Sequence, residues 1–159
     1  MAAPGAGDGI NERFVVEIAG SKGSRELSFA SGTTVASIVD SINSFTEVTG
    51  VRAVASGAGG INLQTVGFGS AEFVSVRVLN NGNINTAVAN AGIYEFGAAD
   101  TNAASLVPAD RTLFSNANNK ITDRGQDISA TINGILATTE GTIARINTER
   151  SFYQYKDAV

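Results

Sequence analysis

One amphipathic helix constrains the fold of this chain more than any other segment. Its apolar residues recur at the i, i+3, i+4 and i+7 spacing that places side chains on one helical face. This stripe consists of Val35, Ile38, Val39 and Ile42. Thr33 or Thr34 precedes it, and a hydroxyl there can accept a hydrogen bond from an unpaired N–H of the first turn. The residues after Gly50 are strand-like and punctuated by glycine. The helix is therefore predicted to bury its stripe against a sheet.

Segments with the alternation of β-strands surround this helix. Residues 13–20 and 26–30 alternate apolar and polar side chains around a short turn, which predicts an antiparallel hairpin. Asn133-Gly134 separates two further apolar runs, and Asn-Gly is the preferred pair for a type I′ turn. Further strands are predicted at residues 51–56, 61–66, 73–79 and 142–147. The predicted fold class is α+β, with mostly antiparallel β-sheets and one main amphipathic helix packed on a sheet.

The composition excludes most enzyme classes. The chain has no cysteine, histidine or tryptophan, so it has no thiolate nucleophile, no histidine base and no Cys/His zinc site. We therefore expect no enzyme activity and no cofactor. The net charge of −4 argues against nucleic acid or an anionic membrane as a partner. No apolar run reaches the roughly 18 residues that a transmembrane helix needs.

Two groups of residues invite ligand-binding interpretations. The glycine-rich stretches at residues 20–24 and 56–60 match neither phosphate-binding fingerprint, so we interpret them as hairpin turns. Asp123, Asp127 and Glu140 do not have the spacing of a calcium-binding EF-hand loop, and we expect no metal site.

The aromatic residues of the second half are candidates for contacts with a partner or ligand, because aromatic side chains are enriched in interfaces. The candidates are Tyr94, Phe96, Tyr153 and Tyr155. The competing interpretation is that the tail aromatics pack onto the core. Asn43 has two interpretations as well, and we favour a structural one, in which its amide helps to end the helix or bonds a nearby turn.

Three segments, in this order, resemble the outer variable-region domain of bacterial flagellins. The first, ELSFASGTTVASIVDSINSFTEVTGVRAVAS, resembles the flagellin hook IN motif. The second is GFGSAEFVSVRVL, and the third is ITDRGQDISATINGILATTEGTIARINT. The resemblance implies a structural role for the motif residues Ile42, Asn43, Thr49, Gly50, Val51, Asn133 and Gly134.

The resemblance also implies a function. A domain of this kind is a structural domain on the outer surface of the bacterial flagellar filament, where it mediates surface display and contacts between neighbouring outer domains in motility. Its partners would be other flagellin subunits, with surface glycans or host receptors as further candidates. Its location would be extracellular, after export through the flagellar secretion channel. The alternative is a carbohydrate or surface-adhesion binding module, or a domain of a hook-associated or filament-cap protein.

The resemblance sets the expected domain organisation. We expect residues 1–12 to be a flexible N-terminal lead or linker and residues 13–159 to be a single flagellin outer domain, with residues 81–119 a loop-rich excursion. Neither end shows the long helices that build the inner tubes of flagellin filaments, so we expect an excised outer domain.

Overall fold

The structure is a computed structural model that describes residues 13–56, 59–82, 92–95 and 110–146. The helices are α1 (Val35–Asn43) and α2 (Thr46–Thr49). The strands are β1 (Arg13–Gly20), β2 (Gly23–Ala30), β3 (Val51–Ser56), β4 (Gly60–Thr65), β5 (Phe73–Asn81), β6 (Ile121–Arg124), β7 (Thr131–Ile132), β8 (Ile135–Leu136), β9 (Thr138–Glu140) and β10 (Ile143–Arg145). All strand pairs among these residues are antiparallel, and together with the one main helix they confirm the predicted α+β class.

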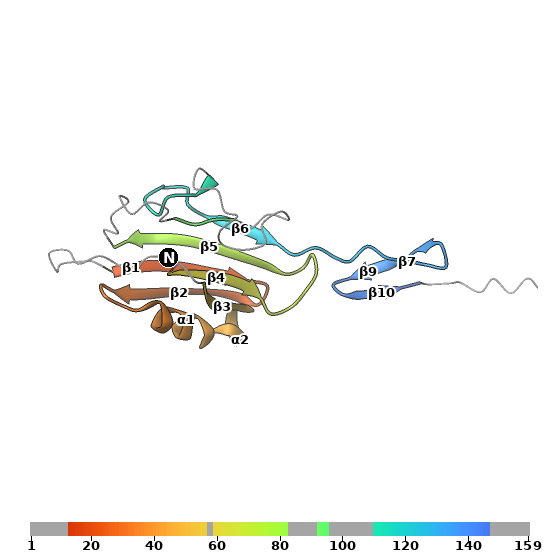
Figure 1. The fold of residues 1–159 in the computed structure, drawn as a ribbon, viewed down its shortest axis with the longest axis horizontal. Helices are drawn as coiled ribbons and strands as arrows, with labels where there is room; N and C mark the ends of the chain where they lie inside the picture. The colour runs from red at the N-terminus through yellow and green to blue at the C-terminus, as the bar shows by residue number, and fades with distance from the viewer. Residues whose placement is uncertain (1–12, 57–58, 83–91, 96–109, 147–159) are drawn as a thin grey trace, which may run out of the picture.

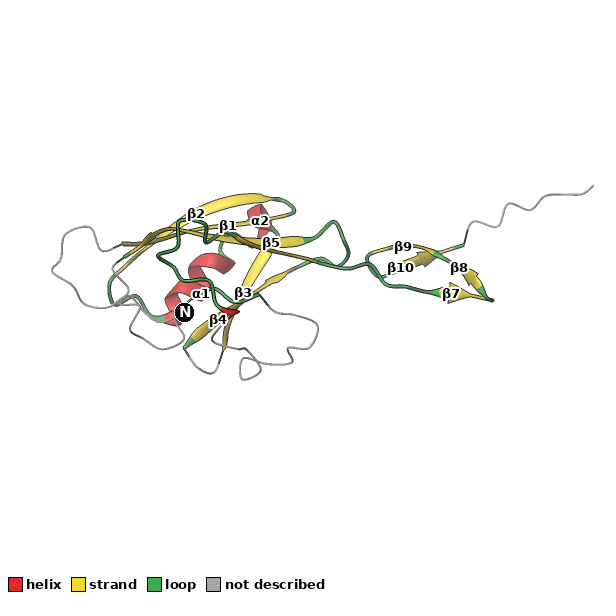
Figure 2. Ribbon diagram, turned by 90° about the horizontal axis from the view of Figure 1, so that it is seen from above, coloured by secondary structure: helices red, strands yellow, loops and turns green. Residues whose placement is uncertain are grey.

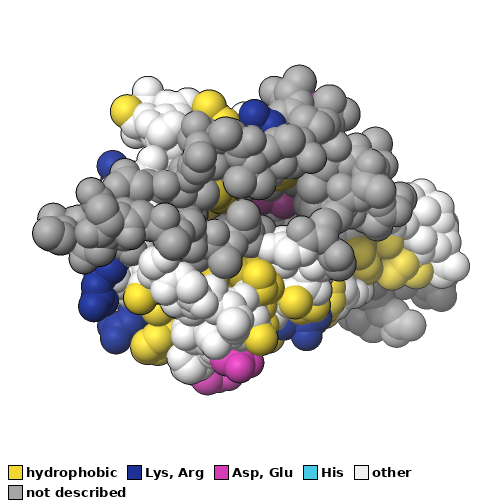
Figure 3. Space-filling model, turned by 60° about the vertical axis from the view of Figure 1, so that its left-hand side comes forward, with side chains coloured by type: hydrophobic (Ala, Val, Ile, Leu, Met, Phe, Trp, Pro, Cys, Tyr) yellow, Lys and Arg dark blue, Asp and Glu magenta, His cyan; other side chains and the backbone are white. Residues whose placement is uncertain are grey.

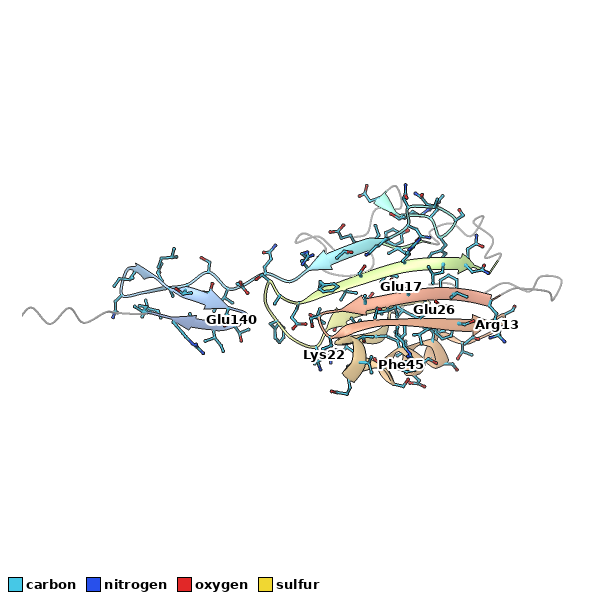
Figure 4. All side chains as sticks on the ribbon, turned by 180° about the vertical axis from the view of Figure 1, so that it is seen from behind. Arg13, Glu17, Lys22, Glu26, Phe45 and Glu140 are labelled. Carbon is cyan, nitrogen blue, oxygen red and sulfur yellow. The ribbon has the colours of Figure 1, made fainter. Side chains whose placement is uncertain are left out.

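A four-stranded sheet in the order β2-β1-β5-β6 forms the body of the molecule (Figure 1). The hairpin β1–β2 is paired along its full length, from Arg13 opposite Ala30 to Gly20 opposite Gly23. Strand β5 pairs with the other side of β1, with a register shift between Val15 and Val16. Alternation along β1 gives the sheet one buried face, and its outward face carries Glu17 and Glu26 on neighbouring strands (Figure 4).

Helix α1 and the hairpin β3–β4 cover the buried face of this sheet (Figure 2). Thr34 caps α1, because its hydroxyl oxygen accepts a hydrogen bond of 3.2 Å from the Ser37 N–H. Ile38 and Ile42 are buried and Val39 packs partly buried beside them, as the predicted stripe requires. The core residues are Phe14, Val16, Ile18, Leu27, Phe29, Ile38, Ile42, Val51, Ala53, Val78 and Phe114.

Two elements of the body were missing from the sequence prediction. Helix α2 lies between α1 and β3, where the sequence predicts no element, and it ends at Gly50, whose N–H donates to the Thr46 carbonyl oxygen at 2.7 Å. Strand β6 pairs with β5 and completes the sheet, although its four residues are mostly exposed and lack an apolar pattern. Both elements depend on contacts outside their own short sequences.

We predict that Ile38→Asp unfolds the domain, because it places an unpaired charge at a position with 0 % exposure. The cost should approach the total stability of a small domain, about 5–15 kcal/mol. Circular dichroism during thermal melting measures the loss. Ala36→Asp introduces the same charge at an exposed position of α1 and is the matched control. Equal melting temperatures for the two variants would contradict the packing of α1 described above.

Candidate functional site

Asn43, the last residue of α1, binds a neighbouring strand through its side chain. Its Oδ1 accepts a hydrogen bond from the Ala53 N–H at 2.8 Å, and its Nδ2 donates to the Ala53 carbonyl oxygen at 3.0 Å. The amide therefore pairs with both backbone groups of one residue of β3, as a neighbouring strand would. The sequence interpretation placed this side chain at the helix end or a turn, whereas it joins the helix end to β3.

Thr49, Gly50 and Val51 make the tight passage from α2 into β3. The Thr49 hydroxyl, buried at 2 % exposure, accepts a hydrogen bond of 3.1 Å from the Val51 N–H. Gly50 adopts the left-handed conformation, with φ of 76°, which favours glycine. Val51 is fully buried in the core beside Ile42 of α1. We propose that the motif residues of this region act in folding and not in ligand binding.

Beyond β6, the chain leaves the body and forms an arm, residues 125–146, that projects away from the sheet (Figure 1). Two hairpins, β7–β8 and β9–β10, follow one another in the arm, with only Ala137 between β8 and β9. Asn133 and Gly134 join β7 to β8 with φ of 52° and 78°, so both have the positive φ of a type I′ turn. The hairpin predicted at this Asn-Gly pair is therefore present, with shorter strands.

The arm exposes large apolar side chains that no described residue covers. Leu136 is 73 % exposed, and Ile135 and Ile143 are each 52 % exposed. Ile128 and Ile132 are also exposed. Two-stranded hairpins have too little packing to be stable alone, so such side chains normally gain stability from a further surface. The space-filling view of the body end shows hydrophobic, basic and acidic side chains in separate small groups (Figure 3).

Asp127 attaches the arm to the body. Its Oδ1 accepts hydrogen bonds from the Ser70 N–H at 2.9 Å and the Gly141 N–H at 2.8 Å, and its Oδ2 accepts one from the Ser70 hydroxyl at 2.7 Å. One carboxylate thus joins the β4–β5 loop, the start of the arm and the β9–β10 turn. Hydrogen bonds from Ser70, followed by that from Gly141, lower the pKa of Asp127, because they favour the charged form.

Glycine allows the close backbone contact beside Asp127. A Cβ on Gly69 would lie 2.6 Å from the Gly141 Cα, closer than real side chains approach. Both glycines have positive φ, of 115° and 59°. Larger residues at either position would push the β4–β5 loop away from the arm.

The aromatic candidates divide into two groups. Tyr94 is half-buried next to the bridge that pairs Ile93 with Thr112. Phe96, Tyr153 and Tyr155 lie outside the described residues. Their role in subunit or ligand contacts therefore stays a prediction.

A shallow groove of about 340 Å³ lies between β5 and residues 114–119. Its deepest amide, Asn119, is 3 % exposed; it accepts a hydrogen bond from the Val78 N–H and donates to the carbonyl oxygens of Val78 and Phe114. The ring of Phe114 is buried against Phe14 in an edge-to-face contact at 5.4 Å. The groove thus offers neither a spare Asn119 amide nor an open Phe114 ring to a sugar. Sequence reasoning missed Asn119, because its partner Val78 lies 41 residues away.

Among the described residues, no group of three or more His, Cys, Asp and Glu side chains is placed to hold a metal ion. In the same part of the chain, no helix is long and apolar enough to cross a membrane.

We predict that Asn43→Asp destabilises the body by about 1–3 kcal/mol, the usual cost of leaving a backbone group without its partner. An aspartate keeps the acceptor for the Ala53 N–H but turns a second oxygen toward the Ala53 carbonyl. Urea unfolding at neutral pH measures the loss. Asn118→Asp makes the same change at an exposed position and should leave stability unchanged. An Asn43→Asp variant as stable as this control would contradict the proposed attachment.

We predict that acid weakens the attachment of the arm. Because the pKa of Asp127 is lowered in the folded protein, its contribution is fully present above the unfolded pKa and is lost as the pH falls through the folded value. The protection of the Ser70 and Gly141 amides against hydrogen exchange should therefore decrease below about pH 4.

Amide exchange by NMR, corrected for intrinsic rates, tests this prediction at each amide. Asp127→Asn should lower the protection of both amides already at neutral pH. Asp123→Asn, on the exposed face of β6, should leave both protected. Unchanged protection in Asp127→Asn would contradict the role of the carboxylate.

Comparison with known families finds a match for the first part of the body. Residues 13–67 match the family model of the flagellin hook IN motif. The chain as a whole has no significant match among curated proteins or solved structures. The matched residues run from β1 to the loop after β4 and include Ile42, Asn43 and Thr49–Val51, whereas the arm lies beyond them. The flagellin family is structural and assembles from flagellin subunits into exported filaments of the motility apparatus. The chain therefore contains a flagellin-related domain that carries the flagellin hook IN motif.

Proposed function

We propose that this chain is displayed on the outer surface of a flagellar filament and that its arm contacts the outer domain of a neighbouring subunit. The observation that carries the proposal is the uncovered apolar surface of the arm, formed by Ile128, Ile132, Ile135, Leu136 and Ile143. The match to the flagellin hook IN motif supports a place in a flagellar filament. The arm supports the contact, because it projects away from the body of its own subunit.

The residue types of the arm favour a contact with a partner through backbone hydrogen bonds and apolar side chains over a contact through charged side chains. Residues 128–139 contain no charged residue and no proline. Natural edge strands are usually protected from pairing by lysine, proline or a covering segment. Residues 128–139 have no lysine or proline, and no segment among the described residues covers them. The strands of the arm can therefore accept another strand edge and bury their apolar side chains in the same contact.

A copy of the same protein is the partner that this arrangement favours. A filament repeats one subunit many times, so each arm extends from its own body into the space next to an identical neighbour. The body also exposes apolar side chains, among them Phe68, which is 78 % exposed, and Val66. An arm that packs against this part of a neighbour would make a head-to-tail contact, which is the type that extends along a filament.

The proposed domain organisation follows the same outline. We take residues 13–159 as one outer domain, with residues 81–119 as an excursion from it and residues 1–12 as a lead. The absence of cysteine agrees with passage through an export channel as an unfolded chain, since no disulfide has to be kept reduced. An extracellular filament is the location that this route implies.

The lack of native cysteine makes the proposal directly testable, because a single introduced cysteine is the only thiol in the chain. We predict that Leu136→Cys, carrying a maleimide–benzophenone label in filaments of flagellin that contain this chain, forms subunit dimers on illumination, because the photoreactive group links to whichever neighbouring residues lie beside the arm. Ser28→Cys, on the exposed side of β2 in the body, is the matched control. Mass mapping of the linked peptides identifies the residues that meet.

The two cysteine variants separate the two parts of the proposal. Labelling of Ser28→Cys by a large maleimide reagent in intact filaments would support display on the outer surface. Linked dimers from Leu136→Cys at several times the Ser28→Cys yield would support the arm contact. Equal yields from both variants would overturn the arm contact, and protection of Ser28→Cys from the reagent would overturn surface display.

A further inference from the structure

The chain contains two Asn-Gly pairs in opposite environments. Asn133-Gly134 forms the tip of the β7–β8 hairpin, and Asn81-Gly82 lies where β5, an inner strand of the body sheet, ends. An asparagine followed by glycine is chemically prone to attack on its own side chain, because glycine lacks the Cβ that would hinder its backbone nitrogen. The two pairs have the same residue types, so the difference in their reactivity comes from their structural surroundings.

The surroundings of Asn133 leave it open. Asn133 and Gly134 are both exposed, and no atom beyond Gly134 and its two chain neighbours lies within 4 Å of the place where a Gly134 Cβ would stand. The strands that hold this turn contribute only two residue pairs, Thr131 with Leu136 and Ile132 with Ile135, and all four residues are exposed. Opening of this tip therefore disturbs very little packing.

The surroundings of Asn81 hold it closed. Asn81 is the last residue of β5 and lies opposite Phe14 in the central sheet. Gly82 is buried, and its N–H donates to the Asn80 Oδ1 at 2.9 Å. A Cβ on Gly82 would lie 2.9 Å from the Phe14 nitrogen, so the Gly82 backbone is packed directly on β1. Reaction at this pair requires the end of the central sheet to open.

We propose that Asn133 is a site of spontaneous self-modification in the folded protein. Solvent base removes the proton of the Gly134 backbone nitrogen, and this nitrogen attacks the Asn133 Cγ. The Cγ–Nδ2 bond breaks and ammonia leaves, which gives a cyclic succinimide. Water then opens the ring at either carbonyl, producing aspartate or isoaspartate. The sequence consumes one water, releases one ammonia and needs no oxidant or reductant.

The product changes the arm in two ways. Either product places a carboxylate in the uncharged stretch of residues 128–139. Isoaspartate also adds a methylene to the main chain, which disrupts the two-residue type I′ turn between Ile132 and Ile135. The modification would therefore mark older molecules at the surface that we propose for subunit contact, although its chemistry does not depend on that proposal.

Peptide mass mapping after incubation of the folded full chain at mildly alkaline pH tests the site. Trypsin releases residues 125–145 as one peptide with a single asparagine, Asn133. We expect this peptide to gain about one dalton and to split into two chromatographic forms, at least about tenfold faster than modification appears at Asn81. In urea, the two Asn-Gly pairs should react at similar rates.

Asn133→Gly is the control variant, because Gly-Gly accepts the positive φ values of this turn but has no side chain to react. Its peptide 125–145 should keep its mass. Modification of Asn81 as fast as Asn133 in the folded protein would overturn the proposal. A mass gain in the same peptide of Asn133→Gly would also overturn it, since Gln126 would then be the reacting amide.

Discussion

The burial of the α1 stripe against the sheet is the contact on which the rest of the structure depends. Ile38 and Ile42 fill the space over the buried side chains of β1 and β2, and the end of the helix is then fixed by Asn43 on β3. This fixed end sets the direction in which α2 and Gly50 return the chain into the core at Val51. We infer that the residues of the hook IN motif hold the end of α1 against β3.

The body and the arm differ in how they are stabilised. The body has a contiguous apolar core that joins β1, β2, β3 and β5 to α1. The arm has exposed apolar side chains and no comparable core, so its stability depends on what it contacts. Asp127 connects the two parts through two hydrogen bonds from Ser70, and a third bond from Gly141 fixes the β9–β10 turn of the arm at the same carboxylate. A well-packed body with an arm whose apolar side chains are exposed is the arrangement we expect of a subunit that contacts identical neighbours.

Local patterns were enough to predict the elements whose stability is local. The stripe of α1, the β1–β2 hairpin and the Asn133-Gly134 turn each follow from periodicity or turn chemistry within a few residues. The sequence did not reveal contacts between distant segments. Asp127 bonds Ser70, which is 57 residues away, and Asn119 bonds Val78, which is 41 residues away. In the sequence alone, single polar residues of this kind cannot be told from solvent-exposed ones, because their hydrogen-bond partners are distant in the chain.

Electron cryo-microscopy of filaments that contain this chain would show where the body and the arm of each subunit lie. We expect density for the β2-β1-β5-β6 sheet and α1 at the outer radius of the filament, with the arm of each subunit touching the next outer domain. Density for the sheet and helix within the inner tubes, or arms that contact no neighbouring subunit, would contradict it.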